Sequence, residues 1–304
     1  MSRDRSAEPD FAQAALSSAT VAIVGLGLMG GSLALALRQS RACRHVCGIA
    51  RRPETVAEAL ARRVVDLGTT SLEEGVAEAD VVVLAVPVRA IIAMIPAVGA
   101  LMKPGSLLLD LGSTKREITQ AMDQLPPHVQ ALGGHPMCGK ESSGLESADL
   151  TLYRGATFAL TPLPRTTPGS LTLAHEMAQA VGAHPLIVEA AQHDRLVAAI
   201  SHLPYLLAAG LVATARTVAQ GDERVWQLAA SGFRDTSRLA ASDVRMMLDI
   251  LMTNRSAIDE MIDLAQANLS ALRDLISSQD EASLQELLST LQQQRAPMFR
   301  KGKV

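Results

Sequence analysis

The chain has 304 residues, of which 48% are hydrophobic and 19% charged, with a formal net charge of −3. This composition supports a sizeable core and excludes an intrinsically disordered protein, and the length suits about two domains. The charge balance, with no basic block, and the aromatic content of 2% exclude an electrostatic or base-stacking surface for nucleic acid.

The N-terminus and the cysteines show no targeting, disulfide or metal signal. Residues 1–19 carry charges of both signs and no apolar stretch of signal-peptide length, which indicates a disordered lead-in to a cytoplasmic protein. Three cysteines are too few and too irregularly spaced for a disulfide framework. We interpret Cys43, Cys47 and Cys138 as small buried hydrophobes in a reducing compartment.

The first ordered unit that the sequence predicts is a strand, a glycine turn and a helix. Residues 20–24 (TVAIV) are typical of a buried parallel strand, and residues 32–38 of a helix. Between them, Gly25, Gly27 and Gly30 have the spacing of a dinucleotide-binding turn. In such a turn the first glycine permits the bend, the second lets the backbone approach a pyrophosphate, and the third packs the helix on the strand. Because glycines interrupt the apolar run, a nucleotide site is predicted in place of a membrane span; a packing turn without ligand is the alternative.

The residues after the second strand bear on the choice of cofactor. The strand at 46–50 is followed by Arg51 and Arg52, and the first carboxylate is Glu54. An NAD enzyme places an acid here on the ribose 2′-hydroxyl, whereas arginine binds a 2′-phosphate through paired N–H donors. The sequence therefore favours NADP, with NAD or a simple solvated turn as alternatives. The other expected cofactor contacts are Leu28, Met29, Val86 and Pro87.

Strands and helices alternate up to about residue 190. Further helices are predicted over 53–63, up to about 102 and from Thr114, and further strands over 79–87, 106–110, 129–132, 157–161 and 185–189. The alternation predicts an α/β Rossmann-type doubly wound, mainly parallel sheet over residues 20–190, with its ligand at the carboxyl ends of the strands.

The character of the chain changes after residue 190. Strand signals vanish, and long apolar patterns of helical period predict an all-α C-terminal domain over residues 191–304. Apolar helical faces of this kind are commonly buried by dimerisation, so we expect a homodimer. His175, His184, His193 and His202 are evenly spaced, but their spacing of about two and a half helical turns would point successive rings in opposite directions. No metal site is predicted.

Four further motifs lie at strand ends or in the helical part: LGSTK (111–115), GGHPMCGKESSG (133–144), HDRLVAAISHLP (193–204) and SGFRDTSRLAASD (231–243). With the glycine turn, they resemble the prephenate/arogenate dehydrogenase family of tyrosine biosynthesis from about Thr20 to about Ala296. The resemblance implies an oxidative decarboxylation. Hydride passes from the hydroxyl-bearing carbon of a cyclohexadiene (prephenate or arogenate) to NAD(P), carbon dioxide leaves, and the phenol ring of 4-hydroxyphenylpyruvate or tyrosine forms.

The resemblance also implies roles for two residues near strand ends. The counterpart of His135 hydrogen-bonds the substrate hydroxyl and assists its deprotonation, which suits an imidazole that is neutral near pH 7. The counterpart of Ser113 contacts the same hydroxyl and orients the histidine. Capping of a helix is a second role open to Ser113.

The remaining site residues are implied by the motifs of positions 133–144 and of the helical part. Arg238 matches an arginine that binds a substrate carboxylate through its bidentate fork, with Arg234 as the alternative and a surface pair with Asp235 as the competing role. His202 matches a histidine near the substrate side chain, and Glu141 an acid at the site entrance.

One substrate-site position departs from the family. Met247 stands where a tryptophan is common, and methionine fills apolar space but cannot donate a hydrogen bond, so the choice between prephenate and arogenate stays open. A β-hydroxyacid dehydrogenase would share the glycine turn but would usually present a lysine where residues 201–204 have none. A cofactor-sensing protein without activity is disfavoured because Ser113, His135 and Arg238 are all present. We expect no nucleic-acid or membrane partner.

Overall fold

The computed structural model describes residues 15–298, which divide into two compact units. The sheet unit contains residues 15–194 and 243–253, and the helical unit contains residues 195–242 and 254–298. The division therefore falls a few residues beyond the predicted boundary at 190, and a segment from the predicted helical domain packs with the sheet. Residues 1–14 of the predicted lead-in lie outside the described residues. Residues 15–19 include a short 3₁₀ helix, η1 (Leu16–Ser18), whose Leu16 is buried.

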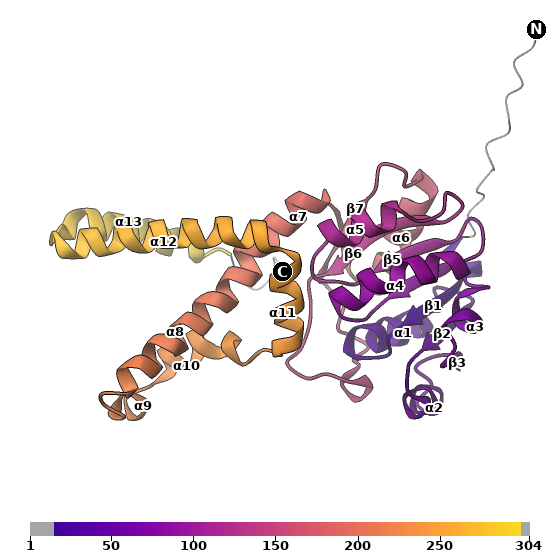
Figure 1. Ribbon diagram of the computed structural model, residues 1–304, viewed down its shortest axis with the longest axis horizontal. Coiled ribbons are helices and arrows are strands. Elements are labelled where there is room, and N and C mark those ends of the chain that lie inside the picture. The colour runs from indigo at the N-terminus through magenta and orange to yellow at the C-terminus, as the bar shows by residue number, and fades with distance from the viewer. Residues whose placement is uncertain (1–14, 299–304) are drawn as a thin grey trace, which may run out of the picture. The chain divides into compact units, whose positions relative to one another are not determined.

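The sheet unit is built on one eight-stranded sheet of order β3-β2-β1-β4-β5-β6-β7-β8 (Figure 1). Neighbouring strands pair in parallel, except for the antiparallel pair β6–β7. The predicted doubly wound, mainly parallel sheet is confirmed. The strands are β1 (Thr20–Val24), β2 (His45–Ile49), β3 (Leu67–Thr69), β4 (Val81–Leu84), β5 (Leu107–Asp110), β6 (Gln130–Pro136), β7 (Thr157–Pro162) and β8 (His184–Ile187).

The central strands form where apolar residues run without interruption. Every residue of β4 and β5 is buried, as parallel strands covered on both faces require. β6 continues to Pro136, past the predicted end at 132, because residues 133–136 pair with β7 after the parallel pairing with β5 has ended at Leu132. Sequence patterning missed β3, which has only three residues, with a glycine in the middle.

Helices and two 3₁₀ turns surround this sheet. They are η1, α1 (Leu28–Ser40), α2 (Pro53–Ala61), α3 (Leu72–Val76), α4 (Val88–Leu101), α5 (Arg116–Asp123), η2 (Leu145–Ser147), α6 (Pro168–Ala180) and α11 (Val244–Thr253). Side-chain contacts hold α11 to the rest of the sheet unit. Arg89 forms an ion pair with Asp249 at 3.2 Å, and the hydroxyls of Thr114 and Thr253 lie 2.8 Å apart.

The helical unit confirms the predicted all-α part of the fold. Its elements are α8 (Leu203–Ala219), α9 (Arg224–Gln227), α10 (Ser231–Ser237), η4 (Arg238–Ala241), α12 (Arg255–Ser277) and α13 (Glu281–Arg295), preceded by α7 (Ala190–Val197) and the π-helical η3 (Ala198–His202). Among the described residues, one helical stretch, Ala190–Ala219, is long and apolar enough to cross a membrane, judged by length and composition alone. Large apolar side chains are exposed on α8, α12 and α13: Leu207, Val218, Leu264, Leu269, Ile276, Leu288 and Leu291.

The three cysteines are free thiols at buried or half-buried positions of the sheet unit. Burial raises the pKa of Cys43 and of Cys138 to about 11, and it also raises the pKa of Cys47. Because the thiolate is the reactive form, these cysteines act as small apolar side chains, as the sequence indicated.

We predict that Gly25→Ala destabilises the sheet unit. Gly25 has a φ of +103°, and a side-chain carbon there would lie 2.5 Å from the carbonyl oxygen of Ala85. Strain and overpacking together should cost roughly 1–3 kcal/mol of unfolding free energy, measured by urea denaturation. Gly27→Ala is the matched control, because an added carbon at Gly27 meets no atom within 4 Å. Equal unfolding midpoints for the two variants would contradict this account of the turn.

Candidate active site

The glycine turn between β1 and α1 lies where the strand order reverses, since β1 has β2 on one side and β4 on the other. The N–H of Gly25 donates to the carbonyl of Ile49 at the end of β2, at 2.9 Å. On the other side, Ala85 and Val86 after β4 lie within contact distance of a carbon built on Gly25. Such a reversal is where dinucleotides bind in doubly wound sheets. Val86 lies beside the turn at this place, and Pro87 follows it as the N-cap of α4.

The start of α1 leaves open space beside the backbone at Gly27. A carbon added to Gly27 meets open space, whereas one added to Gly30 would overlap the carbonyl oxygen of Gly25. Gly27 therefore leaves room for a ligand against the backbone, and Gly30 permits close packing of helix and strand. Leu28 and Met29 are half-buried in the first turn of the helix. The hydroxyl of the fully buried Tyr153 donates to the carbonyl of Met29 at 2.8 Å.

Arg51 and Arg52 lie exposed directly after β2, beside the strand that carries the glycine turn. α2 begins at Pro53, and the first carboxylate, Glu54, lies in its first turn. The strand end that would carry the ribose-binding acid of an NAD enzyme thus presents two guanidinium groups. This arrangement fits a 2′-phosphate.

A fully buried ion pair joins the ends of β5 and β6. Nζ of Lys115 contacts a carboxylate oxygen of Asp110 and donates to the carbonyl of Gly134 at 2.7 Å. The same carboxylate accepts the N–H groups of Gly112 at 2.7 Å and of Gly134 at 3.1 Å. Burial raises the pKa of Asp110 and lowers that of Lys115, while their mutual attraction opposes both shifts. These bonds hold Gly134, and with it the backbone of the following residue, His135.

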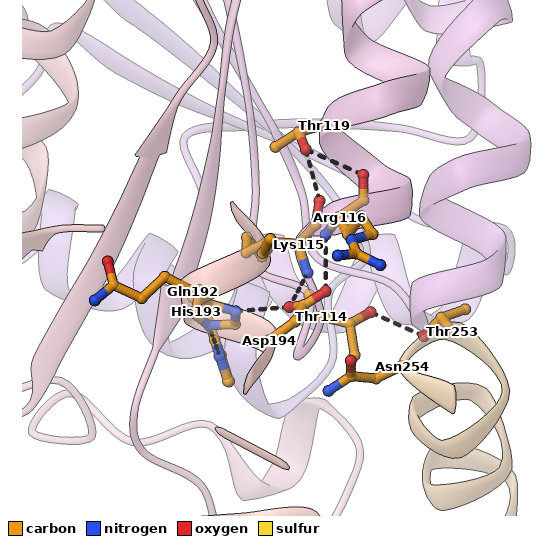
Figure 2. Close-up of polar contacts among 12 residues, drawn as sticks. Thr114, Lys115, Arg116, Thr119, Gln192, His193, Asp194, Thr253 and Asn254 are labelled. Carbon is orange, nitrogen blue, oxygen red and sulfur yellow. Dashed lines mark hydrogen bonds and ion pairs between the residues drawn. The ribbon is translucent and has the colours of Figure 1, made fainter. Parts of the chain in front are cut away.

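The ring of His135 contacts a second histidine, His193, whose bond to Asp194 is drawn in Figure 2. Nδ1 of His135 lies 2.9 Å from Nε2 of His193, and Nδ1 of His193 lies 2.8 Å from Oδ1 of Asp194. The side chains of His193 and Asp194 are buried, with residue exposures of 2% and 3%, whereas His135 is half-buried. A chain of three side chains therefore leads from a buried carboxylate to a histidine at the carboxyl end of β6.

Asp194 also caps α5. Its oxygens accept the N–H groups of Lys115 at 2.7 Å and of Arg116 at 2.9 Å (Figure 2). The predicted start of this helix at Thr114 is two residues early, since α5 begins at Arg116. Ser113 is half-buried before the helix and is not its N-cap, because the N-cap residue is Lys115. The capping role considered for Ser113 belongs to the carboxylate of Asp194, 79 positions after Lys115.

Glu141 and Met247 belong to the sheet unit, where Glu141 is exposed in the loop after β6 and Met247 is buried on α11. His202 and Arg238 belong to the helical unit. His202 is buried, and its Nδ1 lies 3.2 Å from Nδ2 of Asn254.

Arg238 is exposed at the start of η4. Arg234, the alternative to Arg238, forms an exposed ion pair with Asp235 at 2.9 Å.

The four evenly spaced histidines lie on four different elements: α6, β8, α7 and η3. Their spacing therefore describes no single helical face. Within residues 15–298, no group of three or more histidine, cysteine, aspartate and glutamate side chains is placed to hold a metal ion.

Family models cover most of the chain. The prephenate dehydrogenase nucleotide-binding domain matches residues 33–187, and the prephenate dehydrogenase dimerization domain matches residues 189–290. The prephenate dehydrogenase of Bacillus subtilis (strain 168) is 32% identical over 289 residues, 94% of this chain and 78% of that protein. The chain belongs to the prephenate dehydrogenase family. It is thus a prephenate/cyclohexadienyl dehydrogenase, an oxidoreductase of aromatic amino acid biosynthesis that uses a nicotinamide dinucleotide.

Similar proteins are named after different substrates. The cyclohexadienyl dehydrogenase of Zymomonas mobilis is 31% identical over 283 residues, 90% of this chain and 94% of that protein. The crystal structure of A. aeolicus prephenate dehydrogenase with hydroxyphenyl propionate and NAD+ covers 94% of this chain and all of its own, at a TM-score of 0.87 and 30% identity. The Synechocystis arogenate dehydrogenase structure covers 92% and 100%, at a TM-score of 0.83 and 29% identity.

Sequence reasoning missed the groups that surround His135. Lys115 closes the motif LGSTK, and His193 and Asp194 open the motif HDRLVAAISHLP, so the residues stood within quoted motifs without an assigned role. Lys115 and the pair His193 and Asp194 stand among polar neighbours in the sequence, so no apolar pattern marked them as buried.

Proposed function

We propose that the protein catalyses the oxidative decarboxylation of prephenate or arogenate with NADP+ as its preferred oxidant. The observation that carries the proposal is the position of His135. This half-buried imidazole lies at the carboxyl end of β6, on the sheet edge that carries the glycine turn, and its Nδ1 is held by His193. An imidazole held in this way suits the removal of a proton from a substrate hydroxyl.

Two side chains of the sheet unit, His135 and Ser113, are assigned roles at the hydroxyl-bearing carbon of the substrate. The nicotinamide, when bound, accepts the hydride from that carbon. Because Nδ1 of His135 faces His193, we assign the hydroxyl proton to Nε2. Ser113, half-buried after β5, is assigned a contact with the same hydroxyl. Aromatisation of the ring then drives the loss of carbon dioxide.

The substrate carboxylate and side chain are assigned to four further residues. Arg238 takes a carboxylate, since a guanidinium fork matches it with two parallel hydrogen bonds. His202 is placed near the substrate side chain, Glu141 at the entrance, and Met247 at the apolar wall. The family resemblance supports the first three assignments, and Met247 is assigned by its position, where the family commonly has a tryptophan.

A homodimer in the cytoplasm is the assembly that we propose. The helical unit matches a domain described as a dimerization domain, and α8, α12 and α13 expose large apolar side chains. A second copy of the chain would remove this apolar surface from water, which makes the stretch Ala190–Ala219 part of an interface. Sedimentation in detergent-free buffer tests this assembly, and a soluble monomer would contradict it.

Turnover assays on the wild-type protein and on His135→Asn test the reaction. We expect the wild type to form NADPH, detected by fluorescence, with prephenate or arogenate and not with simple β-hydroxy acids. Loss of the general base should lower kcat by roughly 10²–10⁴-fold.

His184→Asn is the matched control, since it removes an exposed histidine from the same unit. Near-normal turnover by His135→Asn would remove His135 from the base role. A wild type inactive on both substrates would overturn the proposed reaction.

The double variant Arg51→Ala/Arg52→Ala tests the cofactor preference. Loss of charge-assisted hydrogen bonds to the 2′-phosphate should lower kcat/KM for NADP+ by about tenfold or more, while kcat/KM for NAD+ changes little. Arg44→Ala serves as a control, because Arg44 is exposed on the same unit just before β2. A wild type that already prefers NAD+ would show that these arginines do not select the cofactor.

The variant Arg238→Ala tests the assigned carboxylate contact. Removing the guanidinium should raise KM for the cyclohexadienyl substrate by about tenfold or more and leave KM for NADP+ unchanged. Arg234→Ala is the comparison, since Arg234 is paired with Asp235 and should tolerate the change. If Arg234→Ala raises KM and Arg238→Ala does not, the carboxylate belongs to Arg234.

A further inference from the structure

The contacts among Asp194, His193 and His135 determine which ring nitrogen of each histidine carries the proton. A carboxylate only accepts, so Nδ1 of His193, 2.8 Å from Oδ1 of Asp194, carries the proton of that ring. In the neutral ring, Nε2 of His193 is then an acceptor. Nδ1 of His135, 2.9 Å from this Nε2, is therefore the donor. The neutral His135 ring is left with its lone pair on Nε2.

We propose that His193 and Asp194 are positioning residues that hold His135 in the Nδ1–H tautomer, so that Nε2 can take the proton of the substrate hydroxyl. The proposal rests on the proposed function, because the tautomer matters only if His135 acts as a base. It follows the logic by which a buried carboxylate orients a histidine in hydrolases, with a second histidine placed between the two.

The proton balance of this step is simple. The substrate O–H bond breaks, its proton goes to Nε2 of His135, and its electron pair forms the carbonyl as hydride leaves the same carbon for NADP+. The Nδ1 proton of His135 stays on that nitrogen and continues to donate to His193. Asp194 receives no proton, and its negative charge stabilises the imidazolium through His193.

The packing around the two positioning residues limits their movement. The N–H groups of Lys115 and Arg116 donate to the Asp194 carboxylate at the start of α5, where the helix dipole also favours a negative charge. His193 is 2% exposed, so little room remains for another ring orientation. On the other side, the backbone next to His135 is fixed by the bonds of Gly134 to Lys115 and Asp110. A histidine held from both sides loses little freedom when the substrate binds.

Two substitutions at His193 separate the positioning role from simple packing. His193→Gln keeps an oxygen that can accept the Nδ1 proton of His135, whereas His193→Leu fills similar space and offers no acceptor. His184→Gln is the matched control at an exposed position of the same unit.

The tautomer itself is measured by nitrogen NMR on protein labelled with ¹⁵N-histidine, with resonances assigned through His135→Asn and His193→Gln. We expect His135 to be protonated on Nδ1 in the wild type and in His193→Gln. In His193→Leu it should shift toward the Nε2–H form, which free imidazole side chains favour. A wild-type His135 protonated on Nε2, or the same tautomer in His193→Leu as in the wild type, would overturn the proposal.

Kinetics on the same variants provide the second readout. We expect His193→Leu to lower kcat by about 10- to 100-fold with KM for substrate and cofactor unchanged, and His193→Gln to recover part of that loss. Wild-type kcat in a folded His193→Leu would also overturn the proposal. If His193→Leu does not fold, the wild-type tautomer and His193→Gln still decide the outcome. If the wild type turns over neither substrate, the proposed function fails, while the NMR result still shows whether His193 sets the tautomer of His135.

Discussion

Lys115 is bonded through both its side chain and its backbone, and these bonds join elements that are far apart in the sequence. Its ammonium group binds Asp110 at the end of β5 and the carbonyl of Gly134 in β6, and its N–H binds Asp194 in α7. Taking two charges out of water costs several kcal/mol for each ion, and only good geometry with further hydrogen bonds offsets that cost. The Asp110 carboxylate meets this requirement with two backbone N–H donors besides the lysine. The positions of His135 and His193 follow from this cluster.

The hydrogen bonds of this cluster hold the residues around His135 in place at the ends of the strands. The ion pair of Lys115 and Asp110 joins the ends of β5 and β6 through its hydrogen bonds. The half-buried His135 is held by its contact with the buried His193. Sites on regular elements are held more closely than sites on loops, which suits a proton transfer that needs a fixed donor–acceptor distance. The glycine turn, which we assign to the cofactor, lies at the same carboxyl edge of the sheet as His135.

Enzymes of this family that are named for different substrates share one fold. Structures of a prephenate dehydrogenase and of an arogenate dehydrogenase resemble this chain about equally, with TM-scores of 0.87 and 0.83. The side chain of the substrate and the 2′-phosphate of the cofactor are each read by a few groups. In our proposal these groups are the arginines after β2 and Met247, which stands where a tryptophan is common. Preference would then rest on local charge and hydrogen-bonding capacity and leave the fold unchanged.

Local patterns determined a large part of this protein. The β-branched run before Gly25, the glycine spacing and the alternation of strands and helices predicted the doubly wound sheet, since each is a property of neighbouring residues. The motifs around His135 and Arg238 indicated the family for the same reason. The positions of β3, the extension of β6 and the packing of residues 243–253 against the sheet unit were decided by pairing with distant segments.

The environment of His135 was decided only by the tertiary structure. The carboxylate that caps α5 comes from Asp194, and the partner of His135 is 58 positions away in the sequence. A buried polar group must find a partner, but sequence order does not say which one, because long-range contacts leave no periodic trace in the chain. The residues thus carried the chemistry, and the folding of α7 against β6 and α5 put them in contact.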